Sequence, residues 1–199
     1  LFPTLIIKYD NFITEQQRVD ILNYVEKSKT KFKTDVGIVT GCASTTYPID
    51  ELILDDIEKC VSSWFNIKES IQTQINSYCL RYGVRTKPID NSWISIQPKG
   101  TKLKKHIHPK STISGVLYLK KADSQDNTVF YSVNPYIDYM DKSYDTKYTI
   151  HKTEISSKQS DMILFPSWFP HDNNEVSSDE DRIILSFNTR SEERRVGKE

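Results

Sequence analysis

After Gly83 the chain becomes a series of short runs rich in Ile, Val, Tyr, Thr and Phe, separated by turn residues. Such runs are typical of β-strands, and Pro98 and Gly100 mark a turn between two of them. The predicted strands cover residues 92–97, 102–108, 114–119, 128–131, 148–154, 161–165 and 182–189. With one more strand at residues 5–9, this pattern predicts a β-sandwich or a jelly roll.

The residues before Gly83 follow a helical pattern instead. Thr14 is expected to cap a first helix, with Gln17 in the reciprocal capping-box position. A second helix is predicted to begin near Asp50 and a third to end at Gly83. Their apolar stripes comprise Leu54, Ile57, Val61 and Trp64, and then Ile71, Ile75 and Tyr78. Helices followed by strands predict an α+β, mainly β fold, in which a helical annex (residues 10–83) packs on a jelly-roll core (residues 84–189).

Three of the four histidines form a pattern that suits a metal centre. His106 and His108 are separated by one residue, and His171 follows sixty-three residues after His108. In a strand, residues i and i+2 point to the same side, so both imidazoles could face one point. Pro166 and Pro170 fix the backbone before His171. Two nearby ligands and one remote ligand are typical of open-sited iron(II) centres, although a lone H-x-H pair also occurs on strand surfaces.

Arg182 begins a predicted strand and lies eleven residues beyond His171. Strand alternation places Ser186 and Asn188 on the same face as Arg182. An arginine among apolar residues needs an anionic partner, which the carboxylate of a small cosubstrate would provide. The alternative is a surface arginine paired with an acidic residue of segment 179–181.

Composition limits the other classes of protein. With 37% hydrophobic and 27% charged residues, the 199-residue chain suits one globular domain. Its formal net charge of zero argues against nucleic-acid binding through bulk charge, and no apolar run approaches the roughly 20 residues that span a bilayer. Cys42, Cys60 and Cys79 lack metal-site spacing and are expected to be reduced structural thiols of a cytoplasmic protein.

Other catalytic patterns are missing from the sequence. It contains no G-x-S-x-G nucleophile elbow, and its six glycines form no phosphate-binding loop. Cys60 and Cys79 fall within predicted helices, where we expect them to be packed. His151 lies in a polar predicted strand and is expected at the surface.

Four ordered blocks, residues 92–100, 106–119, 164–171 and 182–188, resemble the 2-oxoglutarate/Fe(II)-dependent oxygenases. The second block carries the pattern H-x-H-P-x-S-x-x-S-G-V-x-Y of a branch often found in viruses of marine bacteria. The resemblance covers roughly residues 1–189 and is most specific between 92 and 188.

The resemblance implies a double-stranded β-helix core that binds one Fe(II) and the cosubstrates 2-oxoglutarate and O₂, with ascorbate as an accessory cofactor. In these enzymes an H-x-D/E pair and a distal histidine bind the iron, and a later basic residue holds the far carboxylate of 2-oxoglutarate. By position, this implies His106 and His171 as metal ligands and Arg182 as the carboxylate-binding residue. Ser186 is expected to help Arg182 hold this carboxylate, and Tyr118 to add a hydroxyl contact to the cosubstrate.

His108 departs from the family pattern, which has Asp or Glu at that position. His108 could be the third metal ligand. It could instead lie outside the ligand set and leave that coordination position vacant or filled by water, or the metal chemistry could have been lost. An all-imidazole site has one negative charge fewer, which changes the preference among metals. Asp172 and Glu175 lie near His171 in sequence and could supply a carboxylate instead.

The expected function is therefore hydroxylation of an unidentified prime substrate, with release of succinate and carbon dioxide. A non-enzymatic jelly-roll binding or virion-type structural protein is the alternative. A cupin-type metal enzyme that does not use 2-oxoglutarate would need the histidines but not Arg182. Segments 32–48 and 133–147 are candidate lid or specificity loops, or solvated connections.

The two ends of the chain show signs of truncation. The sequence does not begin with Met, and residues 190–199 resemble a translated sequencing-library adapter. We therefore expect residues 1–189 to form a single domain and leave the last ten residues out of functional reasoning.

Overall fold

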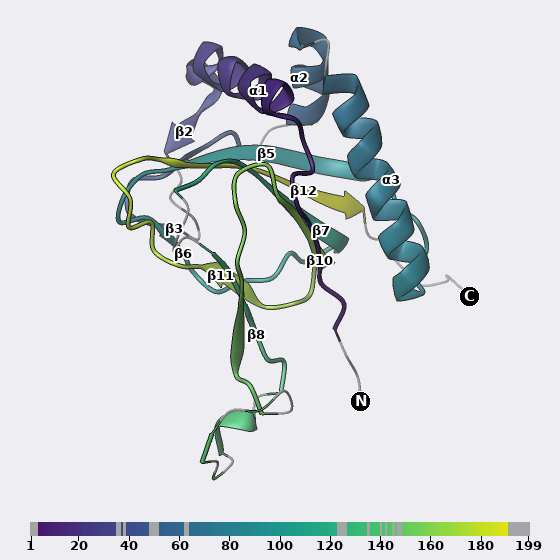
Figure 1. The fold of residues 1–199 in the computed structure, drawn as a ribbon, viewed down its shortest axis with the longest axis vertical. Coiled ribbons are helices and arrows are strands. Elements are labelled where there is room, and N and C mark those ends of the chain that lie inside the picture. The colour runs from purple at the N-terminus through teal and green to yellow at the C-terminus, as the bar shows by residue number, and fades with distance from the viewer. Residues whose placement is uncertain are drawn as a thin grey trace, which may run out of the picture.

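A computed structural model describes residues 4–34, 37, 39–47, 52–61, 64–122, 127–134, 136–139, 141, 143–144, 146 and 149–190. Two antiparallel sheets face each other in a double-stranded β-helix, or jelly roll, and helices pack on the outer face of the larger sheet (Figure 1). Of the predicted tail, Arg190 ends the last strand, and residues 191–199 lie outside the described part of the chain.

The large sheet has seven strands in the order β1-β10-β7-β12-β5-β4-β2. Their bounds are β1 Ile7–Tyr9, β2 Lys33–Thr34, β4 Ser44–Thr45, β5 Ile89–Gln97, β7 Ser111–Lys120, β10 Met162–Pro166 and β12 Arg182–Arg190. The small sheet has the order β11-β8-β9, with β8 Thr128–Tyr131, β9 Lys152–Ile155 and β11 His171–Asn173. A separate pair joins β3 Val39–Thr40 to β6 Lys102–Leu103.

Three α-helices cover one face of the large sheet: α1 Glu15–Lys27, α2 Ile53–Cys60 and α3 Trp64–Tyr82. The predicted capping box is confirmed, because the Thr14 side chain accepts from the Gln17 amide and the Gln17 side chain accepts from the Thr14 amide. The predicted stripe from Leu54 to Trp64 is wrong as one helix, because α2 ends before Val61, whose backbone is extended. No helix among the described residues is long and apolar enough to cross a membrane.

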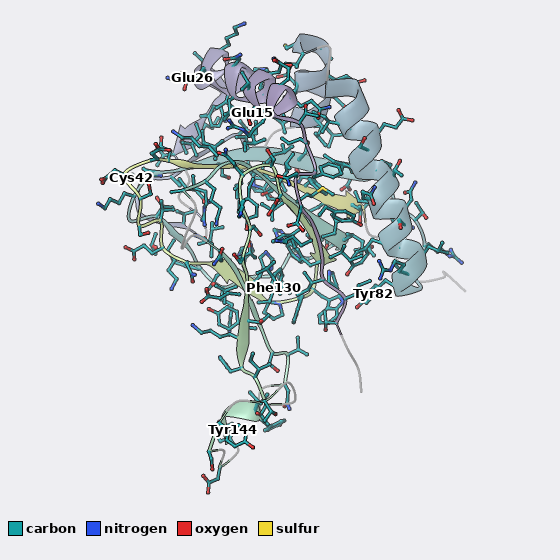
Figure 2. All side chains as sticks on the ribbon, viewed as in Figure 1. Glu15, Glu26, Cys42, Tyr82, Phe130 and Tyr144 are labelled. Atoms are coloured by element: carbon teal, nitrogen blue, oxygen red, sulfur yellow. The ribbon has the colours of Figure 1, made fainter. Side chains whose placement is uncertain are left out.

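Strand alternation divides the buried apolar residues into two layers. Leu117, Leu185 and their alternate neighbours pack toward the helices, in a cluster with Ile21, Leu54 and Ile71 of α1–α3. The side chains on the opposite face of the large sheet meet the small sheet. This second cluster comprises Val116, Tyr118, Phe130, Ile163, Phe165, Phe169 and Ile184, and Figure 2 marks Phe130 within it. The large sheet is therefore buried on both faces.

Several local predictions are corrected by the structure. Segment 32–48 contains the short strands β2, β3 and β4 where a loop was expected. Cys60 is exposed and not packed, whereas Cys79 is buried as expected. His151 is half-buried beside Tyr131, with 5.9 Å between the ring centroids, so it is less exposed than expected.

The connection between β8 and β9 projects away from both sheets and contains a short 3₁₀-helix, Ile137–Tyr139 (Figure 1). Tyr136, Tyr139 and Tyr144 of this connection are exposed, and Tyr144 lies near its far end (Figure 2). We call the described residues between 132 and 151 the β8–β9 extension.

Candidate metal centre

Backbone pairing brings the two halves of the histidine pattern together. His106 and His171 form an isolated antiparallel bridge, in which each amide donates to the other's carbonyl at 2.9 and 3.0 Å. The His108 amide donates to the Ser167 carbonyl at 2.8 Å. The predicted strand over 102–108 is wrong beyond Leu103, where β6 ends. Residues 104–108 instead run beside β11 and the turn that precedes it. This pairing nevertheless directs both imidazoles toward His171.

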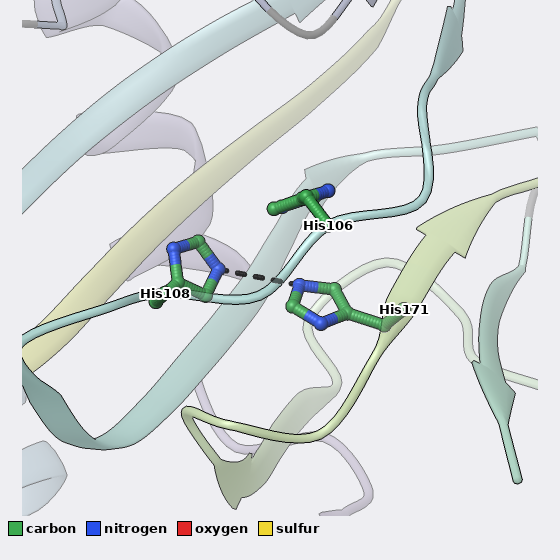
Figure 3. A group of neighbouring side chains, drawn as sticks. All are labelled: His106, His108 and His171. Atoms are coloured by element: carbon green, nitrogen blue, oxygen red, sulfur yellow. Dashed lines mark hydrogen bonds between the residues drawn. The ribbon is translucent and has the colours of Figure 1, made fainter. Parts of the chain in front are cut away.

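The three imidazoles converge on one point (Figure 3). One ring nitrogen from each of His106, His108 and His171 lies within 4.8 Å of the others. The ring centroids are 5.0 Å apart for His106 and His108, 4.4 Å for His106 and His171, and 5.0 Å for His108 and His171. The closest approach is between Nε2 of His108 and Nε2 of His171, at 3.2 Å.

Hydrogen bonds to backbone carbonyls orient two of the rings. The Nδ1 atom of His106 lies 2.7 Å from the Lys104 carbonyl, and Nδ1 of His171 lies 2.8 Å from the Phe169 carbonyl. A carbonyl only accepts, so both Nδ1 atoms carry the proton and both Nε2 atoms present a lone pair. Metal-binding histidines are commonly oriented in this way.

The environment keeps the imidazoles neutral. Burial lowers the pKa of His106 below its usual value. Burial, together with the neighbouring His106, lowers the pKa of His108 to about 3. Burial and the other two histidines hold the pKa of His171 well below its usual range. Neutral imidazole is the form that binds a metal ion.

The donor set fits a divalent first-row transition metal. Three neutral imidazoles suit iron, nickel, copper or zinc, and three protein ligands leave coordination positions for small molecules. Among the described residues, the cluster of possible metal ligands contains no carboxylate. Asp172 is buried and accepts a hydrogen bond from the Tyr131 hydroxyl at 2.7 Å, and Glu175 is exposed.

The histidines line a cavity of about 300 Å³ between the two sheets. We call it the histidine cavity. The large sheet lines it with Trp93, Ser95 and Gln97 of β5, Gly115, Val116 and Tyr118 of β7, and Arg182, Ile184, Ser186 and Asn188 of β12. Thr45 and Tyr47 also line it, so segment 32–48 reaches the site as expected. None of the described residues of the β8–β9 extension lines it, which gives no support to a lid role for that segment.

Arg182 lies inside the molecule and faces this cavity. Its side chain is only 2% exposed, and its Nε donates to Oε1 of Gln97 at 2.7 Å. The alternative of a surface arginine is therefore wrong. Two of the acidic residues considered as its partners form ion pairs with lysines, Asp179 with Lys99 and Glu180 with Lys120. The cavity thus holds a buried cation on the same sheet face as Tyr118.

Tyr118 and Ser186 line the cavity at different positions along the large sheet. The Tyr118 hydroxyl lies 2.5 Å from Oγ1 of Thr128, and burial raises the pKa of this phenol, so it stays protonated. Ser186 pairs with Trp93 across β12 and β5, and the Trp93 ring lies 5.9 Å from that of His108. Four residues of strand, roughly 13 Å, separate Ser186 from Arg182. The serine therefore lies toward the metal end of the cavity.

The residues of the histidine cavity that sequence reasoning missed include Tyr47, Trp93 and Gln97. The signal for two of them was available, since alternation along β5 places Trp93, Ser95 and Gln97 on one face. Only the pairing of β5 with β12, which sets Gln97 opposite Arg182, shows that this face is the inner one.

Comparison with known proteins agrees with this site. Residues 91–188 match the family model described as "Putative 2OG-Fe(II) oxygenase". This segment contains the three histidines, Arg182 and the β5, β7, β10 and β12 strands almost entirely. A search of curated proteins finds no match to the chain.

Solved structures with low sequence identity share the fold. A prolyl-4-hydroxylase from Pseudomonas putida is 11% identical, with a TM-score of 0.59 over 96% of this chain and 94% of that one. A Trichoplax adhaerens prolyl hydroxylase is 13% identical, with a TM-score of 0.61 over 94% and 84%. HygX from Streptomyces hygroscopicus, solved with nickel, 2-oxoglutarate and hygromycin B, is 9% identical, with a TM-score of 0.60 over 94% and 83%.

The family match covers most of the residues that line the histidine cavity, and the fold agrees over nearly the whole chain. The chain belongs to the 2OG-Fe(II) oxygenases, enzymes that use Fe(II) and 2-oxoglutarate.

Proposed function

We propose that His106, His108 and His171 together bind the Fe(II), and that Arg182 binds the far carboxylate of 2-oxoglutarate. The enzyme would hydroxylate a C–H bond of an organic prime substrate. The observation that carries this proposal is the presence of three neutral imidazoles and a buried arginine in one cavity. A cupin-type enzyme without 2-oxoglutarate would have no use for the buried cation.

When bound, Fe(II) and 2-oxoglutarate supply the oxidation: one oxygen atom of O₂ enters the substrate as a hydroxyl, the other enters succinate, and carbon dioxide leaves. The chain's own contribution is to hold and orient these groups. The carbonyls of Lys104 and Phe169 keep the Nε2 lone pairs of His106 and His171 directed at one point. His108 supplies the third imidazole where the family usually has a carboxylate.

Arg182 provides the charge that the far carboxylate needs. A guanidinium binds a carboxylate through parallel hydrogen bonds, and burial strengthens this attraction. Tyr118 lies on the neighbouring strand and faces the same cavity, so its hydroxyl is a second candidate contact. Ser186 lies too far along β12 to share that carboxylate in an extended strand, and we propose it as a contact at the metal end.

The prime substrate would enter beside His108. Tyr47 is half exposed, and its ring packs edge-on against Trp93 with 5.2 Å between centroids. Trp93 in turn contacts His108. Both aromatic side chains line the histidine cavity, and apolar lining of this kind favours an apolar segment of substrate over water.

The test is an anaerobic titration of the full chain with Fe(II) and then 2-oxoglutarate, monitored by the visible charge-transfer band of the chelate. The band should vanish in His171→Ala. In Arg182→Ala it should require far more 2-oxoglutarate. A folded, iron-loaded protein that gives no band would contradict the proposal and favour a metal enzyme independent of 2-oxoglutarate.

A further inference from the structure

Gln97 is a buried polar residue that lines the histidine cavity beside Arg182. Its side chain is 1% exposed, and it is paired with Arg182 across β5 and β12. Nε of Arg182 donates to Oε1 of Gln97 at 2.7 Å. This bond fixes one edge of the guanidinium against the sheet, so the rest of the group is held at the cavity.

The same bond determines which way the Gln97 amide points. An arginine nitrogen can only donate, so the amide atom facing it must be the oxygen. The amide nitrogen, Nε2, therefore lies on the other side. It is buried and has no hydrogen-bond partner among the described residues. Buried amide donors without a partner are rare in folded proteins, and a ligand is one of the ordinary explanations.

The histidine cavity itself offers this nitrogen no suitable anion. Asp172 is the only acidic side chain among the described residues that line it, and its carboxylate accepts from the Tyr131 hydroxyl on the small sheet. A ligand that places a carboxylate next to Arg182 would meet both the cation and the free amide donor. Gln97 would then hold the cation through Oε1 and the anion through Nε2.

We propose that Gln97 is a binding and positioning residue for the far carboxylate of 2-oxoglutarate, acting together with Arg182. This inference rests on the proposed function. The amide makes the subsite selective for a 2-oxo acid that carries a second carboxylate, because only such an acid satisfies the Nε2 donor.

The test compares two 2-oxo acids with the full chain, loaded with Fe(II) under anaerobic conditions. 2-Oxoglutarate carries the far carboxylate and pyruvate lacks it. Binding is measured from the charge-transfer band and by calorimetry. In Gln97→Leu, 2-oxoglutarate affinity should fall about tenfold to a hundredfold, the range for a buried hydrogen bond to a charged group. Pyruvate affinity should stay unchanged.

Gln97→Glu is the sharper variant, because it keeps the acceptor for Arg182 and nearly the same volume but replaces the donor with a negative charge. It should weaken 2-oxoglutarate binding more than Gln97→Leu does, again without an effect on pyruvate. Ile96→Val, the adjacent residue packed toward the helices, is the matched control and should change neither affinity.

The outcomes separate the two proposals. Equal losses for both acids would show a merely structural role for Gln97 and overturn the inference. Unchanged 2-oxoglutarate affinity in both variants would also overturn it. If wild-type protein gives no band with either acid, the proposed function fails and this inference fails with it.

Discussion

Nε2 of His108 and Nε2 of His171 lie 3.2 Å apart, although sixty-three residues separate them in the sequence. His171 presents a lone pair at Nε2, because its Nδ1 donates to the Phe169 carbonyl. The neutral Nε2–H tautomer of His108 can donate a hydrogen bond to this lone pair. When the proton of His108 lies on Nδ1 instead, two lone pairs face each other at this distance, and a metal ion bound between them relieves their repulsion.

The first prediction concerns the metal preference of His108→Asp. Replacing a neutral imidazole with a carboxylate restores the family's usual ligand charge. A unit charge about 4 Å from a cation contributes about 1–4 kcal/mol in a partly solvated site, so Mn(II) affinity should rise by about fivefold to a thousandfold. Zn(II) affinity should rise less, since zinc loses a favoured imidazole. Calorimetric titration of both metals under anaerobic conditions measures the ratio.

The matched variant for this experiment is His108→Ala, which removes the ligand without adding charge. It should weaken the binding of both metals. If His108→Asp and His108→Ala give the same ratio of Mn(II) to Zn(II) affinity as the wild type, His108 is not a ligand. Its coordination position is then vacant or filled by water.

The second prediction concerns removal of the metal. A metal that binds only the folded state increases the free energy of unfolding by about 2.7 kcal/mol when its concentration is a hundred times its Kd. This stabilisation raises the melting temperature. Adding a chelator to the metal-loaded protein should therefore lower the melting temperature measurably. His171→Ala should lose this response, and His151→Ala, which changes the histidine outside the cluster, should keep it. A response that persists in His171→Ala would place the stabilising metal elsewhere.

The third prediction concerns Gly115, at the centre of β7. A Cβ atom at this position would lie 2.3 Å from Cζ of Phe187 and 2.8 Å from Cδ2 of Leu164. Gly115→Ala should therefore destabilise the protein by about 1–3 kcal/mol through overpacking, as measured by urea denaturation. The cost should be smaller in a Phe187→Leu background, which makes room for the methyl group. Equal costs in both backgrounds would mean that the clash with Phe187 is not the cause.

Much of the strand content could be predicted because it depends on local pattern. The face of β12 that carries Arg182, Ser186 and Asn188 follows from period-two alternation alone, and all three line the histidine cavity. The Thr14 capping box is equally local. Such features depend on residues close in sequence, whose identities were visible.

What could not be predicted depends on contacts between distant segments. The irregular path of residues 104–108 is set by the bridge between His106 and His171, and nothing in the sequence of that segment distinguishes it from a strand. The role of Gln97 likewise depends on the register of β5 against β12. The break between α2 and α3 could not be predicted either, because the apolar spacing continues across Val61 although the backbone there is extended.

The last prediction uses Trp93 as an internal reporter of the metal. Its ring lies 5.9 Å from that of His108, so a paramagnetic ion held by the three histidines should quench its fluorescence by short-range contact. Addition of Co(II) or Fe(II) to the wild-type protein should lower the emission. Trp93→Phe should remove most of this change, because the indole nearest the site is gone.

Trp168→Phe is the control, since this residue is 45% exposed and lies outside the lining of the histidine cavity. Quenching that survives in Trp93→Phe and disappears in Trp168→Phe would mean that the ion binds away from the three histidines. Quenching that depends on Trp93 and is also lost in His106→Ala would tie the signal to the metal centre and give a direct measure of the Kd for each metal.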